Sequence, residues 1–194
     1  VDSSAFQTDP WQRKRGGGGI TKVLEGDVFK KAGVNTSQVH GPISKTEESM
    51  FSQLVAKVNP SFVLDESTYF FATGISLVIH PTNPFVPTVH ANYRYFEITN
   101  QTDTCWWFGG GADLTPYYLF DEDATHFHDI HKKACDRYQD GSYDAFKSAC
   151  DDYFFIPHRN ETRGVGGIFF DYLNHDYGSL FNFVSDISNE FVAA

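Results

Sequence analysis

The sequence is poor in cysteine, in long apolar runs and in positive charge, and each shortage excludes a class of protein. Its 194 residues include three cysteines and no C-x-x-C pair, so neither a disulfide framework nor a zinc ribbon is expected. No apolar stretch reaches the length of about 18 residues that could cross a bilayer. The net charge of −10 argues against nucleic acid or an anionic membrane surface as the main partner.

The rest of the composition is that of a folded protein. Hydrophobic residues make up 41% of the chain and charged residues 21%, and the 19 Phe, 10 Tyr and 3 Trp are too many for a disordered segment. The length predicts one domain, residues 1–194. The last predicted helix meets Ala193-Ala194 without a Gly, Pro or basic stop signal, so we expect that domain to be incomplete at its C-terminal side.

Alternating and β-branched patterns dominate, and they predict an α+β fold with a large, mainly antiparallel sheet. The Gly109-Gly110-Gly111 run is expected to end one of the strands. A capping box, Ser44 to Glu47, starts a helix that Asn59-Pro60 stops. The predicted strands are 20–25, 28–31, 68–80, 88–98, 105–108 and 167–173. Further helices are predicted over 121–137, 143–153 and from 179 onward.

One strand carries the strongest signal for a site. Alternation over 88–98 points His90, Asn92 and Arg94 to one face, and Val89, Ala91, Tyr93 and Tyr95 to the other. A proton carrier, an amide and a guanidinium fork on one face suit the binding of an anion. Arg94 is also the only basic residue between Lys57 and Lys132. The alternative is a solvated outer face of an edge strand.

Two further positions are candidates for binding. Asp113 follows the glycine run, where a backbone without bulky side chains lets a large flat ligand approach; the alternative is a turn residue at a strand end. Arg159 and Arg163 form a second cationic spot, although either could instead pair with Glu161 within the loop.

Eight histidines raise the question of a metal, but the familiar ligand spacings are missing. The sequence also contains no Gly-x-Ser-x-Gly, G-x-G-x-x-G or P-loop motif. From the residues alone we predict an anion-binding, aromatic-lined cleft with acid and base groups.

Three segments in order, residues 74–81, 87–94 and 106–116, give the sequence a resemblance to the oxygen-dependent coproporphyrinogen III oxidases of haem biosynthesis. The resemblance runs through nearly the whole chain and implies a large antiparallel sheet with helices on both faces and a homodimer. The implied reaction is the O₂-dependent oxidative decarboxylation of two propionates of coproporphyrinogen III to vinyl groups, giving protoporphyrinogen IX, with no cofactor or metal.

The same resemblance implies roles for individual residues. His90 matches a proton donor, and Asp113 and Arg163 match residues that hold the porphyrinogen and its carboxylates. The positions that match substrate-binding residues are Ser76, Asn92, Tyr93 and Arg94. A quartet sometimes assigned as metal ligands in bacterial members is matched by His80, His90, His128 and His158, although the family's reaction is metal-free.

Two other classes stay open: a non-catalytic tetrapyrrole-binding module and a histidine-metal oxygenase. The resemblance implies a cytoplasmic protein or one of the mitochondrial intermembrane space. Members of the family also continue beyond the position of Ala194 with strands, dimer contacts and a carboxylate of the active site, so we expect weak or no activity from residues 1–194 alone.

Overall fold

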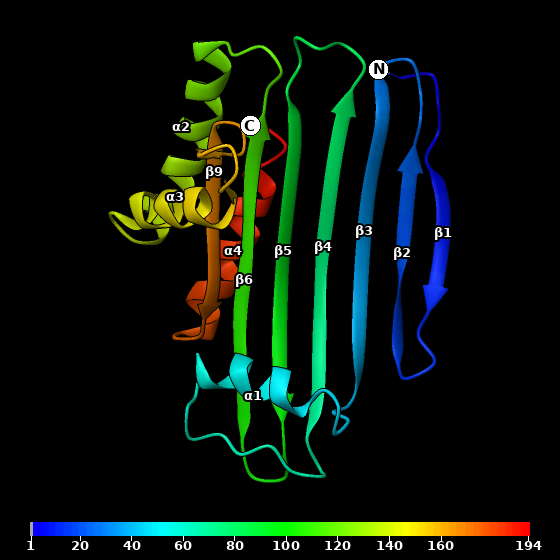
Figure 1. The fold of residues 1–194 in the computed structure, drawn as a ribbon, viewed down its shortest axis with the longest axis vertical. Coiled ribbons are helices and arrows are strands. Elements are labelled where there is room, and N and C mark those ends of the chain that lie inside the picture. Colours follow the sequence, from blue (N-terminus) through cyan, green and yellow to red (C-terminus); the bar gives the residue numbers. More distant parts are fainter. Residues whose placement is uncertain (1) are drawn as a thin grey trace.

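Long antiparallel hairpins make up most of the molecule. The computed structural model describes residues 2–194, in which a seven-stranded antiparallel sheet has the order β1-β2-β3-β4-β5-β6-β9 (Figure 1). Its strands are β1 (Gln7–Gln12), β2 (Gly17–Leu24), β3 (Phe29–Pro42), β4 (Tyr69–Pro81), β5 (Thr88–Thr99), β6 (Thr104–Thr115) and β9 (Gly166–Leu173). The first six follow one another along the chain, and only β9 joins after a long excursion.

That excursion contains most of the helical structure. A small separate ladder pairs β7 with β8. The elements outside the large sheet are α1 (Glu48–Ala56), α2 (Asp121–Tyr138), α3 (Ser142–Tyr153), β7 (Phe155–Ile156), β8 (Glu161–Thr162) and α4 (Tyr177–Glu190).

Helices cover both faces of the sheet, which confirms the predicted architecture. Helix α1 packs Phe51 against Phe70 and Phe96 on one face. Helices α2 and α4 pack on the other face, where Tyr93 lies in the same core as Phe127 and Ile187. In Figure 1 α1 crosses in front of β5 and β6, whereas β6 passes in front of α4. The two cores are therefore separated by the sheet.

The prediction that the glycine run ends a strand was wrong. Gly109, Gly110 and Gly111 lie in the middle of β6, paired with Arg94, Tyr93 and Asn92 of β5. Glycine is intrinsically poor in a strand, but here side-chain or backbone atoms of the neighbouring strands occupy the space that a Cβ would need. A Cβ on Gly110 would stand 2.7 Å from the Tyr93 ring. Sheet pairing on both sides thus overrides local propensity and carries the strand on to Thr115.

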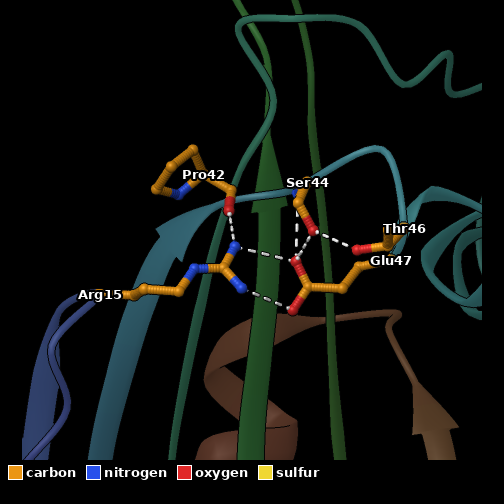
Figure 2. Close-up of polar contacts among 5 residues, drawn as sticks. All are labelled: Arg15, Pro42, Ser44, Thr46 and Glu47. Carbon is orange, nitrogen blue, oxygen red and sulfur yellow. Dashed lines mark hydrogen bonds and ion pairs between the residues drawn. The ribbon is translucent and has the colours of Figure 1, made fainter.

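The predicted capping box forms only in part, because α1 begins at Glu48 and its N-cap residue, Glu47, makes no side-chain cap hydrogen bond. Glu47 does accept a hydrogen bond from the Ser44 backbone N–H at 3.1 Å, which is one of the two bonds of a capping box. Arg15 adds a two-pronged contact to the same carboxylate and also donates to the Pro42 carbonyl (Figure 2). The Arg15 and Ser44 hydrogen bonds lower the pKa of Glu47 to about 2. The turn after β1 is thereby tied to the start of α1.

Histidine 131 is buried in α2 without full hydrogen bonding. Its ring is 0% exposed, and Nδ1 donates to the Phe127 carbonyl at 2.8 Å. Nε2 has no hydrogen-bond partner within residues 2–194. Burial lowers the pKa of His131, because a second ring proton would have no acceptor in this apolar surrounding.

This residue should make the fold sensitive to acid. The unfolded chain takes up a proton at His131 at a higher pH than the folded chain, so stability falls as the pH falls below about 6.5. In the intact protein, His131→Leu should shrink the loss of unfolding free energy between pH 7 and pH 5 by about 1–2 kcal/mol. Urea denaturation at both pH values measures this. The exposed His158→Leu serves as the control, and an equal loss in wild type and H131L would refute the assignment.

Candidate functional site

The register of the sheet gathers polar residues on one face. Directly opposed residues in antiparallel strands share a face, and β5 pairs with β4 and β6 without a register shift. His90 therefore lies beside Asp113, and Asn92 lies beside Ser76. Arg94 stands between Gly74 and Gly109. The predicted alternation of β5 is confirmed.

Asp113 is the anchor of the site. Its side chain is 1% exposed, and it accepts a hydrogen bond from His90 Nδ1 at 2.7 Å. Arg163 donates to the same carboxylate through Nε at 3.1 Å and through Nη2 at 2.7 Å. The turn alternative is wrong, because Asp113 lies inside β6. Both carboxylate oxygens accept from protein donors, and the expected contact of Asp113 with the ligand stays a prediction. Arg159, not Arg163, makes the loop ion pair with Glu161.

The contact with Asp113 sets the chemistry of His90. A carboxylate only accepts, so Nδ1 carries the proton and Nε2 of the neutral ring is left as an acceptor. The His90 side chain is 33% exposed and lines two hollows, one of about 410 Å³ and one of about 450 Å³. Arg163 lines both as well. His90 is thus placed to take or give a proton beside the guanidinium groups of Arg163 and Arg94.

Arg94 is held by two neighbours. Its Nη1 donates to Asn92 Oδ1 at 2.9 Å, and its Nη2 donates to Asp171 Oδ2 at 2.8 Å. The Arg94 side chain remains 35% exposed and lines the 410 Å³ hollow together with His90 and Arg163. The guanidinium has five N–H donors, so these two bonds leave others for an anionic ligand.

Aromatic side chains wall this hollow. Phe154, directly after α3, lies under the Arg163 guanidinium at 3.9 Å and meets the His90 ring edge-on. Tyr153 stacks on Phe169 of β9 at 4.1 Å. Sequence reasoning assigned no role to these three residues or to Asp171. Alternation in β9 would have placed Phe169 and Asp171 on one face, but the end of α3 gives no comparable signal.

Two predicted substrate-binding residues lie in different places. Ser76 is on the site face, beside a shallower hollow of about 230 Å³ that Asn92 and Arg94 also line. The Tyr93 side chain is only 6% exposed on the opposite face, where its hydroxyl donates to the Ile187 carbonyl at 3.5 Å. β alternation turns the Tyr93 side chain into the core under α4, away from the hollows, and its role in substrate binding stays a prediction.

The four histidines considered as metal ligands are not brought together. Only His80 and His90 line one hollow. His128 uses both ring nitrogens on the protein, with Val165 and Tyr143 as partners, and His158 lies exposed between β7 and β8. Across residues 2–194 no three His, Cys, Asp or Glu side chains are arranged to hold a metal ion.

The cysteines do not offer a nucleophile in this region. All three are free and buried, and burial raises the pKa of Cys150 to about 12. A thiol with this pKa stays protonated at neutral pH.

The described part of the chain also has no helix long and apolar enough to span a membrane.

The chain is similar to known proteins over most of its length. Three similar relatives are the oxygen-dependent coproporphyrinogen-III oxidase of Drosophila melanogaster, coproporphyrinogen-III oxidase 1, chloroplastic, of Arabidopsis thaliana, and the mitochondrial oxygen-dependent coproporphyrinogen-III oxidase of Mus musculus. They are 53%, 48% and 54% identical over 93%, 97% and 90% of this chain. The matches cover 46%, 50% and 39% of those proteins, so the chain spans about half their length or less.

A family model covers the whole sequence. The model described as coproporphyrinogen III oxidase matches residues 1–194, which include the anchored Asp113 and every other residue of the site. This chain belongs to the coproporphyrinogen III oxidase family.

Proposed function

We propose that the intact protein converts coproporphyrinogen III to protoporphyrinogen IX by O₂-dependent oxidative decarboxylation of two propionates. The observation that carries the proposal is one hollow faced by the His90 imidazole and by the guanidinium groups of Arg94 and Arg163, with Asp113 holding His90 and Arg163. Relatives about 50% identical are named for this enzyme. Because the chain spans about half of these relatives, the activity is proposed for the complete protein.

The site face suits a flat, polyanionic ligand. Gly74 lies beside Arg94 and Gly111 lies beside Asn92, and both glycines line hollows on this face. A macrocycle can approach the backbone at these two glycines, whereas the Arg94–Asp171 ion pair fills the space over Gly109. Its propionates need cations, and Arg94 and Arg163 supply forks that match carboxylate geometry. The aromatic wall of Tyr153, Phe154 and Phe169 supplies apolar contact for the ring system.

In the proposed reaction the protein mainly orients the substrate, because the pyrrole ring and O₂ supply the redox chemistry. In our proposal the electron-rich pyrrole adds to O₂ to form a peroxide on the ring, and the peroxide takes a proton from the β-carbon of the propionate. The bond to the carboxylate then breaks, CO₂ leaves, and the peroxide departs as hydrogen peroxide. Each conversion thus turns one propionate, one O₂ and one proton into a vinyl group, CO₂ and H₂O₂, with O₂ as the acceptor of the two electrons. Arg94 fixes the reacting carboxylate, and His90, oriented by Asp113, exchanges the proton through Nε2. Asp113 itself acts through His90 and Arg163.

Further parts of this reading belong to the proposal. We propose O₂ as the co-substrate with no cofactor, and a homodimer as the active form, which light scattering of the intact protein tests. The names of relatives include chloroplastic and mitochondrial forms, so a cytoplasmic location also stays a prediction.

One experiment separates the proposal from its alternatives. Coproporphyrinogen III, prepared anaerobically, is mixed with the intact protein, and O₂ is then admitted. We expect CO₂ release and, after oxidation of the product, protoporphyrin fluorescence. Binding without CO₂ release would instead indicate a carrier module. Activity that depends on stoichiometric iron, copper or zinc, found by elemental analysis and removed by chelation, would indicate a metal oxygenase.

A further inference from the structure

The strand β9 is interrupted beside Arg94. Its pairing with β6 shifts register between Phe108 and Gly110, so that two residues of β9, Asp171 and Tyr172, lie opposite Gly109. This is a β-bulge, a feature that re-aims side chains beside functional sites. Tyr172 has φ of +59°, a left-handed conformation that is uncommon for a residue other than glycine.

The bulge places Asp171 against Arg94. Besides the ion pair through Oδ2, Asp171 Oδ1 accepts the Tyr172 backbone N–H at 3.0 Å, which fixes the carboxylate to the bulge itself. The contact passes over a glycine: a Cβ at position 109 would overlap Asp171 Oδ1 and stand 2.9 Å from Arg94 Nε. Gly109 therefore leaves the space in which the ion pair forms.

Tyr172, the residue in the left-handed conformation, is held by contacts with Trp107 of β6 and with Lys57 at the end of α1. The Tyr172 ring lies against Trp107 at a centroid distance of 5.8 Å. Lys57, at the end of α1, stands over the ring at 4.6 Å and donates to the hydroxyl at 3.3 Å. Such contacts over-determine a backbone conformation that costs on the order of 1–3 kcal/mol by itself.

We propose that Asp171 is a positioning residue for the substrate carboxylate: the bulge holds its carboxylate so that Arg94 is oriented toward the hollow. This rests on the proposed function, in which Arg94 binds a propionate. Asn92 and Asp171 engage Nη1 and Nη2 and restrict rotation of the guanidinium, while its remaining N–H groups stay available. The Asp171 side chain is 18% exposed and also competes, as an anion, with the incoming carboxylate.

These two effects give Asp171→Asn an unusual kinetic signature. The neutral amide frees Arg94 from its competing anion but orients it poorly. We therefore expect kcat to fall about tenfold or more, because small displacements of a reacting group are costly. Binding of the stable probe coproporphyrin III, followed by fluorescence, should be as tight as in the wild type or tighter. General damage to the site would weaken binding and lower kcat together.

A double-mutant cycle makes the assignment specific. In an Arg94→Ala background, Asp171→Asn should cause no further loss of kcat, because the group that it positions is gone. The matched control is Asp103→Asn in the turn before β6, where Asp103 Oδ1 also accepts the backbone N–H of the next residue but the carboxylate makes no ion pair with any other residue of the range 2–194. D103N should keep wild-type kinetics.

A crystal structure of the intact D171N protein gives a readout independent of activity. We expect the Arg94 guanidinium to leave its position beside Asn92 or to occupy several positions. An unmoved guanidinium, or wild-type kcat in D171N while the wild-type protein is active, would overturn the role of Asp171. A wild-type protein that releases no CO₂ would refute the proposed function instead. In that case the position of the Arg94 guanidinium in the D171N crystal structure would still test whether Asp171 orients Arg94.

Discussion

Asp113→Asn should lower kcat/KM by about a thousandfold and also destabilise the fold. The variant keeps the shape of the side chain but removes the charge to which His90 and Arg163 are bound. An amide can donate to His90 Nδ1, which would move the ring proton to Nε2 and spoil its use as an acceptor. A comparable change in another histidine–aspartate pair costs about 10⁴ in kcat.

The stability effect follows from burial. Removing one partner of a buried ion pair costs about 3–5 kcal/mol, and we expect about 2 kcal/mol here because Arg163 is 39% exposed and water can solvate it. Steady-state kinetics and urea denaturation of the intact protein measure the two effects. Asp151→Asn is the matched control, since it removes the charge of a carboxylate that pairs with Lys147 at 2.6 Å but is 36% exposed. A D113N protein with kcat/KM within threefold of wild type would contradict the anchoring role.

Arg94→Ala should lower kcat/KM by about a hundredfold. A carboxylate bound by a partly buried guanidinium loses about 3 kcal/mol when the guanidinium is truncated. The loss of kcat/KM should exceed the effect of the missing guanidinium alone. Without Arg94, Asp171 is left as an unpaired anion beside the incoming propionate. Anaerobic binding and O₂-pulse turnover with coproporphyrinogen III measure affinity and rate separately.

Two further variants test the explanation. Arg94→Lys keeps the charge but not the two-pronged geometry, so we expect its activity to lie between those of R94A and the wild type. Arg137→Ala removes an arginine that pairs with Glu190 on the far side of the molecule and should leave kinetics unchanged. Unchanged kcat/KM in folded R94A protein would remove Arg94 from the proposed mechanism.

The sequence was informative where the chain is regular. Alternation in β5 placed His90, Asn92 and Arg94 on one face because a strand has a fixed period of two and this strand has no bulge. The same rule correctly turned the Tyr93 side chain away. The helices were predictable for a similar reason, since their apolar residues recur at the helical period.

Where tertiary structure overrides local pattern, prediction failed. Three successive glycines ordinarily end a strand, and only the neighbouring strands explain why β6 continues through Gly109–Gly111 to carry Asp113 inside the sheet. The pairing of Asp113 with Arg163 joins residues 50 positions apart, which no local period encodes. The ion pair of Asp171 with Arg94 depends on the β-bulge at Asp171 and Tyr172. The sequence around these two residues has no Gly or Pro that would predict the bulge.

The unbroken register of the β4–β5 and β5–β6 hairpins has a consequence for the loops that connect them. A slip of one residue would turn His90, Asn92 and Arg94 into the core and bring Tyr93 to the surface. Loop residues 82–87 and 100–103 close those hairpins. Their lengths therefore determine which side of the sheet is reactive. An insertion there is not the neutral event that it is in most surface loops, even where no inserted atom comes near the site.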